Sequence, residues 1–176
     1  MAVGTIWVHA EAVEGRIATI TLEMLAKARE LGGTVECFYS GADADAIAPT
    51  LGAHGATKVH ATGDLGGGLP GPHLSAALAS AIEGGAAPDL IMFGTTYDGR
   101  DIAGRLSVKL DKPVITNNTD IAEEGDALVV SEPIFGGTQI VKTKPLSPVG
   151  STVASTHPSH IGRRPWWRDP CRVQVG

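Results

Sequence analysis

A regular alternation of apolar runs of strand length with amphipathic helical segments constrains this chain of 176 residues more than any other feature. The helical segments carry apolar residues at spacings of three, four and seven, and paired glycines close several of them. Alternation of this kind favours a parallel sheet, because each parallel connection needs a crossover and right-handed crossovers dominate. We predict strands over 5–10, 34–39, 57–61, 89–93 and 113–116, with helices over 17–31, from Asp43 through Leu51, from Leu74 through Ile82 and over 98–110.

The pattern changes after a turn-like segment at 123–126. Three strand candidates follow at 127–131, 138–143 and 149–155, with no helical segment between them. Antiparallel additions to the sheet account for them most simply. We therefore expect an α/β fold with three Rossmann-like layers, of the adenine-nucleotide α-hydrolase-like kind. Helices would cover both faces of a mostly parallel sheet, and antiparallel strands would be added near the carboxy end.

The composition shifts again at His157. Arginine, tryptophan and proline are mixed there without periodicity, and the basic residues of this segment are Arg163, Arg164, Arg168 and Arg172. The length of the chain suits one domain with a well-buried core. We expect one α/β domain over 1–156, followed by an irregular tail over 157–176.

Charge and composition exclude several classes of protein. The formal net charge of -5 gives no broad basic surface for nucleic acid. The first residues do not resemble a signal peptide, and no stretch approaches the roughly 18 apolar residues of a membrane span. Cys37 and Cys171 do not indicate a disulfide framework. We expect a cytoplasmic protein with neither nucleic-acid partner nor membrane span.

The strongest local motif runs from Phe93 to Asp101, where a strand ends, a small-residue turn follows and a helix begins. Open α/β sheets bind ligands at this edge, so free amides at the helix start make an anion or nucleotide site chemically reasonable. A structural interpretation is also open, in which Asp98 and Asp101 cap the helix and Asp101 pairs with Arg105. The candidate residues of this loop are Gly94, Thr95, Thr96, Gly99, Arg100 and Asp101.

Other binding and catalytic motifs are missing from the sequence. There is no Walker phosphate loop, no Gly-x-Gly-x-x-Gly after the first strand and no Gly-x-Ser-x-Gly elbow. The segment 11–15 instead supplies acidic residues where a phosphate would need amides. His157 and His160 have the spacing of a ligand pair, but Pro158 prevents a regular helix there. We predict no catalytic residues and no metal site.

Several motifs, taken in order, resemble the electron transfer flavoprotein alpha subunit family. The helix containing 21–33 resembles the start of these subunits, and 53–59 resembles their short Gly-Ala-x-Lys-Val segment. The block 88–110 resembles their Phe-Gly-x-Thr-x-x-Gly-Arg-Asp-x-Ala-x-Arg-Leu motif. Phe135, Gly136 and Gly137, after Pro133 and Ile134, resemble their Pro-Val-Tyr-Gly-Gly turn. The match is colinear over roughly 3–155, which makes the set specific although each motif alone is weak.

The resemblance implies a heterodimer with a beta subunit, in which FAD carries electrons from acyl-CoA or other dehydrogenases to a quinone-linked acceptor. It implies an electron carrier component rather than a catalyst. In this family a carboxy-terminal domain holds the FAD, and no counterpart follows Ser155, so we expect no FAD to be bound by this chain alone. We expect the loops 94–101 and 135–137 to serve as subunit contacts.

Two further interpretations stay open beside a truncated subunit. One is a split subunit whose flavin domain is encoded separately. The other is a free-standing adenine-nucleotide-binding module of the universal-stress or nucleotide-hydrolase type. The sequence weighs against this module, because 109–112 leads straight into a strand where such modules carry a glycine-rich phosphate segment.

Overall fold

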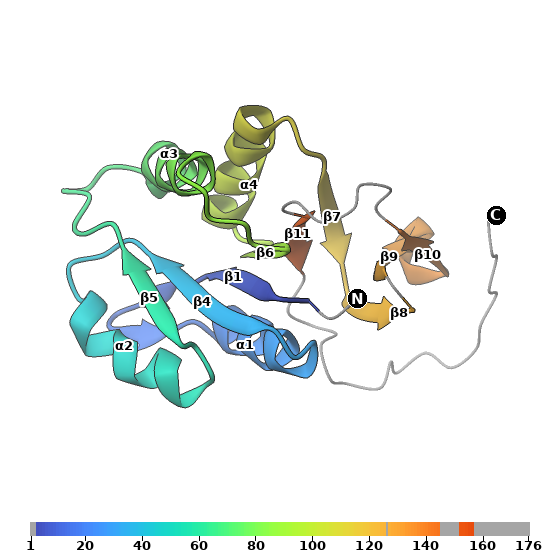
Figure 1. The fold of residues 1–176 in the computed structure, drawn as a ribbon, viewed down its shortest axis with the longest axis horizontal. Helices are drawn as coiled ribbons and strands as arrows, with labels where there is room; N and C mark the ends of the chain where they lie inside the picture. The colour runs from blue at the N-terminus through green and yellow to red at the C-terminus, as the bar shows by residue number, and fades with distance from the viewer. Residues whose placement is uncertain (1–2, 126, 145–151, 157–176) are drawn as a thin grey trace.

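A six-stranded parallel sheet organises the domain in the computed structural model, which describes residues 3–125, 127–144 and 152–156. Its strand order is β5-β4-β1-β6-β11-β7, and every neighbouring pair is parallel (Figure 1). The strands are β1 (Thr5–His9), β4 (Thr34–Tyr39), β5 (Lys58–Ala61), β6 (Leu90–Gly94), β7 (Val114–Asn118) and β11 (Thr152–Thr156).

Four helices cover the two faces of this sheet, with α1 and α2 on one side and α3 and α4 on the other (Figure 1). Their bounds are α1 (Thr19–Glu30), α2 (Ala44–Ala53), α3 (Pro70–Glu83) and α4 (Tyr97–Leu110). On the first face Met24 and Leu51 pack with the alternate strand residues Ile6 and Val8. On the opposite face the side chain of Trp7 packs with residues of α3 and α4. Successive side chains of β1 therefore point into two separate hydrophobic cores, one on each face of the sheet.

The predicted fold class is confirmed, and so is the strand and helix alternation as far as β7. The predicted strand 34–39 matches β4 at both ends. The largest difference at a helix start is in α3, which begins at Pro70 and not at the predicted Leu74. Proline suits the first turn of a helix because its missing N–H would have no partner there.

The carboxy-terminal strands pair differently from the expectation. Antiparallel strands are present, but they form their own sheet in the order β10-β9-β8, made of β8 (Asp120–Glu124), β9 (Ala127–Ile134) and β10 (Gln139–Thr143). The last strand, β11, is parallel and lies between β6 and β7 in the main sheet. Residues 149–151 of that predicted strand lie outside the described residues. Strand patterning identifies a strand but not its partner, which explains the difference.

Two short elements were missed by the sequence analysis. A hairpin of β2 (Ala12–Val13) and β3 (Arg16–Ile17) stands between β1 and α1, with Glu14 and Gly15 at positive φ in its turn. Strand β8 was not predicted, and its end overlaps the predicted turn-like segment 123–126; Ile121 is its one large apolar residue. Both elements are too short or too polar to show a period of two.

The small antiparallel sheet is joined to the main domain by apolar and ionic contacts. Ile121 and Val130 are buried in the same core as α1 and α2. Beside them, the Lys27 ammonium on α1 lies 2.8 Å from Asp120 on β8 and 2.9 Å from Glu30. The backbone N–H of Val3 also donates to Glu123 Oε1 at 2.9 Å. Burial lowers the pKa of Lys27, but the two carboxylates raise it further, so its charged form is favoured.

We expect Lys27→Met to lower the free energy of unfolding by about 1–3 kcal/mol, because it removes the charge that joins α1 to β8 while keeping the apolar stem. Lys109→Met is the matched control: Lys109 also lies in the last turn of a helix but is exposed, with no ionic partner among the described residues. Its effect should stay within about 0.5 kcal/mol. Urea denaturation followed by circular dichroism measures both values. Equal losses in the two variants would contradict this role of Lys27.

Candidate functional site

The topological switch point of the main sheet lies between β1 and β6. From β1 the chain moves outward through β4 to β5, and α3 then carries it back to β6 on the other side of β1. Open α/β sheets bind ligands in the crevice beyond the carboxyl ends of such a strand pair. The candidate loop 94–101 stands at this crevice, because it begins at the carboxyl end of β6.

Thr96 caps α4, in place of the predicted aspartate arrangement. Its Oγ1 accepts a hydrogen bond from the backbone N–H of Gly99 at 3.0 Å, which satisfies one of the free amides at the helix start. Asp98 is exposed, and the cap is Thr96, so the expectation that Asp98 and Asp101 form the cap is wrong. The predicted pair of Asp101 and Arg105 is confirmed, with Arg105 Nε donating to Asp101 Oδ1 at 2.8 Å.

The glycines of the loop allow close backbone approach. A Cβ placed on Gly94 would lie 2.9 Å from Ile20 Cγ1 and 3.3 Å from Glu11 Oε1. A Cβ on Gly99 would collide with the carbonyl oxygen of Gly94. These two glycines therefore bring the start of α4 against the ends of β6 and β1, and the space beside them is filled by protein atoms.

Glu11 occupies the crevice at the end of β1. Its Oε1 accepts a hydrogen bond from Thr96 Oγ1 at 2.7 Å, and its backbone N–H donates to Thr21 Oγ1 at 2.9 Å. His9 Nδ1 lies 3.4 Å from the same carboxylate oxygen, and the His9 side chain is 4% exposed. Burial raises the pKa of Glu11, but His9 and Thr96 lower it more, and the result is a pKa below the usual value. The carboxylate is therefore negatively charged at neutral pH.

This geometry does not fit a phosphate or the pyrophosphate of a dinucleotide. A carboxylate already stands in the crevice, and it would repel a second anion. The amide of Gly99 is bound to Thr96 Oγ1, and the amide of Arg100 is bound to the carbonyl oxygen of Thr96. At the switch point Glu11 therefore occupies the place beside the start of α4, and two backbone amides of that helix start already have partners within the protein.

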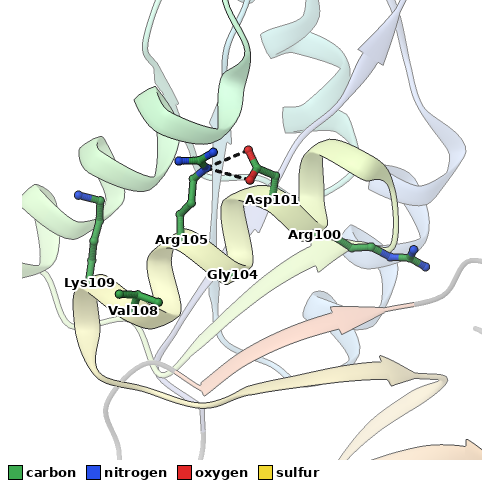
Figure 2. Close-up of a pocket in the computed structure, with 6 residues that line it drawn as sticks. All are labelled: Arg100, Asp101, Gly104, Arg105, Val108 and Lys109. Carbon is green, nitrogen blue, oxygen red and sulfur yellow. Dashed lines mark hydrogen bonds and ion pairs between the residues drawn. The ribbon is translucent and has the colours of Figure 1, made fainter.

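Figure 2 shows a shallow hollow on the outer surface of α4. Asp101 and Arg105 point toward each other there, whereas Arg100 points away from them. The hollow is lined by Arg100, Asp101, Gly104, Arg105, Val108 and Lys109. All of these residues belong to one helix, so the hollow is a feature of the helix surface and not a cleft between elements.

The second candidate loop, η1 (Phe135–Gly137), joins β9 to β10. Phe135, Gly136 and Gly137 all have positive φ, at 50°, 67° and 89°, as the prediction of a tight glycine turn requires. The Phe135 side chain is 76% exposed. The structure does not bring the two candidate loops into one site, because 94–101 packs against β1 and α1 while 135–137 belongs to the small sheet.

The remaining chemistry-bearing groups form no further site within the described ranges. Burial raises the pKa of the Cys37 thiol to about 12, so this cysteine is a poor nucleophile at neutral pH. In the part of the chain that the structure describes, no group of three or more His, Cys, Asp or Glu is placed to hold a metal ion. His157 and His160 lie outside it. The described helices include none long and apolar enough to cross a membrane.

Sequence reasoning missed the contact of His9, Glu11 and Thr96. Glu11 was noted as an acid unsuited to phosphate, but its bond to Thr96 joins residues separated by 85 positions. The available signal was an acid two residues after β1 together with a threonine two residues after β6, since these two strand ends meet at the switch point.

Fold and site together define a three-layer α/β domain of the nucleotide-binding type whose switch point is filled by its own side chains. The electron transfer flavoprotein domain model matches residues 6–159, and the chain therefore belongs to that family. This confirms the resemblance found in the sequence, and the free-standing adenine-nucleotide module is not favoured.

Curated relatives agree with this family. The chain is 28% identical over 140 residues to an electron transfer flavoprotein subunit alpha of Syntrophomonas wolfei, covering 78% of the chain and 44% of the relative. It is 30% identical over 148 residues to that of Thermoanaerobacterium thermosaccharolyticum, covering 79% and 44%. It is 27% identical over 173 residues to the electron transfer flavoprotein subunit alpha of Megasphaera elsdenii, covering 91% of the chain and 48% of the relative. The chain thus spans less than half the length of each of these relatives.

We expect Gly94→Ala to lower the free energy of unfolding by about 1–3 kcal/mol, because the added methyl group would press on Ile20 and on the Glu11 carboxylate. Gly104→Ala is the matched control, since nothing lies within 4 Å of a Cβ at this exposed helix position. It should raise stability by about 0.5–1 kcal/mol. Urea unfolding of both variants measures the two values. A Gly94→Ala variant as stable as the wild type would disprove the close approach.

The lowered pKa of Glu11 predicts a specific dependence of stability on pH. Because the folded pKa lies below the unfolded value of 4.5, the charge of Glu11 contributes stability above the unfolded pKa, and this contribution is lost as the pH falls through the folded pKa. The difference in unfolding free energy between the wild type and Glu11→Gln should be constant above about pH 5.5 and shrink below about 4.5. Urea titrations at a series of pH values measure it, with Glu14→Gln as the reference for net charge. If the difference in unfolding free energy between the two proteins does not change with pH, the pKa of Glu11 is not lowered in the folded state.

Proposed function

We propose that this chain acts as the amino-terminal domain of an electron transfer flavoprotein alpha subunit. The observation that carries the proposal is the family match over 6–159, together with relatives named electron transfer flavoprotein subunit alpha. In this role the chain is a component of a heterodimeric electron carrier and not a catalyst in its own right. Its partner is a beta subunit, and the complex takes electrons from acyl-CoA or other dehydrogenases in the cytoplasm and passes them to a quinone-linked acceptor.

FAD, when bound in such a complex, supplies reversible electron transfer. We infer that the residues of this chain contribute scaffold and contact surface instead of the main flavin ligands. The filled switch point supports this inference, since Glu11 stands beside the start of α4, where an anionic ligand group would have to lie, and the amides of Gly99 and Arg100 are bound within the protein. The proposed domain over 1–156 would then present its contacts on loops, with 157–176 as a separate tail.

The loop 135–137 is the better supported of the two proposed contacts. Phe135 exposes 76% of its surface on the turn, and Ile140 on the adjacent edge strand β10 exposes 41%. Large apolar side chains exposed on a turn and on the edge strand that follows it favour burial against a partner. In the loop 94–101, Tyr97 exposes 92%, whereas Thr96 and Gly99 form the cap of α4. The other candidate residues of this loop, Gly94, Thr95, Arg100 and Asp101, stay proposed contacts.

We expect the tagged chain, co-expressed with the beta subunit from the same organism, to retain that subunit through affinity purification. Phe135→Asp should weaken the complex by at least about tenfold, because aromatic residues at the centre of an interface contribute strongly to binding. Val108→Asp is the matched control, since Val108 is 83% exposed on α4. Densitometry of the eluate and calorimetric titration measure the change.

Two results would overturn the proposal. One is a wild-type chain that retains no beta subunit. The other is stoichiometric yellow flavin absorbance in the isolated chain purified with added FAD, which would place the flavin ligands on this chain.

A further inference from the structure

The crevice at the switch point favours negative charge although no ligand phosphate fits it. It lies at the amino-terminal end of α4, a helix of 14 residues, where the helix dipole favours an anion. The group found there is the carboxylate of Glu11, which is mostly buried, with 18% of its side chain exposed. Burial by itself makes a carboxylate harder to ionise and raises its pKa. The pKa of Glu11 is nevertheless lowered, so its surroundings stabilise an anion more than burial opposes it.

Thr96 connects this carboxylate to the helix. Its hydroxyl donates to Glu11 Oε1 at 2.7 Å and accepts from the amide of Gly99 at 3.0 Å. The chain of hydrogen bonds therefore runs from the first turn of α4 through Thr96 to the anion. Gly94, whose absent side chain leaves room for Oε1, brings the end of β6 against the same oxygen.

His9 supplies an independent observation. Its residue surface is 4% exposed, and its Nδ1 is buried with no hydrogen-bond partner among the described residues. This nitrogen lies 3.4 Å from Glu11 Oε1, beyond good hydrogen-bond distance for a ring nitrogen. Buried polar atoms are nearly always hydrogen-bonded, and this buried nitrogen faces the Glu11 oxygen, whose pKa it helps to lower, at a distance longer than a good hydrogen bond. It is therefore placed to bond an anion at this position.

We propose that the switch-point crevice is an anion site closed by an internal ligand, the carboxylate of Glu11, and that removing this side chain opens it to a phosphate group. The phosphate would take the place of the carboxylate, accept the hydroxyl hydrogen bond of Thr96, and lie beside His9 and the start of α4. Glu11 is then the residue that decides whether this fold binds a phosphate ligand. The inference does not rest on the proposed function, since it concerns a crevice away from the loop 135–137.

The test measures thermal unfolding of Glu11→Ala during titration with inorganic phosphate, with sodium chloride keeping the ionic strength constant. We expect its Tm to rise by about 3–6 °C when phosphate is about tenfold above the dissociation constant. The wild type and Glu14→Gln, which removes a charge from the exposed turn of the β2–β3 hairpin, should show no specific rise. Glu11→Gln should also show none, because it removes the charge but still fills the space.

A second variant and a second ligand sharpen the result. The double variant Glu11→Ala with Thr96→Val should lose most of the response to phosphate, because it removes the hydroxyl donor. If AMP raises the Tm of Glu11→Ala at a lower concentration than inorganic phosphate does, the ligand is a whole nucleotide. If the two raise it at equal concentrations, the ligand is the phosphate group alone. Either result supports the opened site.

Other outcomes would overturn the proposal. These are a folded Glu11→Ala variant whose Tm does not respond to phosphate or AMP, or a wild type that responds as strongly as the variant. If Glu11→Ala is unfolded at 25 °C in chloride, recovery of its circular dichroism spectrum in phosphate at equal ionic strength supports the proposal, and failure to recover overturns it.

Discussion

The covering of a parallel sheet on both faces is the constraint on which the rest of this structure depends. Each strand of such a sheet has two apolar faces to bury, so its helices must be divided between them. In β1 the alternation is visible residue by residue, since Ile6 and Val8 meet α1 and α2 while Trp7 meets the opposite layer. The chain must therefore change faces once, and that change between β5 and β6 creates the switch point.

That crevice must then be filled by a ligand or by the protein itself. In this domain Glu11, Ile20 and the cap of α4 fill it. Gly94 and Gly99 allow the close approach of protein atoms there. Membership in a flavoprotein family and a switch point occupied by protein side chains are compatible, because family membership concerns the fold and a site concerns particular residues.

The sequence was sufficient for the main fold because local patterns determine it. Helical spacing ending in glycine pairs, and apolar runs such as 34–39, need no knowledge of distant residues. Local patterns did not predict which strands are neighbours in the sheet. Strand β11 has the same local pattern whether it pairs antiparallel at an edge or enters between β6 and β7, and the difference depends on which strands have a free edge. For the same reason Glu11 could be recognised as unsuited to phosphate, but its bond to Thr96 could not.

The position of β11 also explains how the small sheet is tolerated. The chain leaves the main sheet from β7 and returns in β11, which is hydrogen-bonded to β7, so the strands β8 to β10 form an insertion between two neighbouring strands. Such an insertion leaves the order of the central strands unchanged. Its attachment then falls to a few contacts, namely Ile121 and Val130 in the core and Lys27 with Asp120 at its margin. The sheet that carries Phe135 is therefore fixed to the domain at one end and free to present its turn at the other.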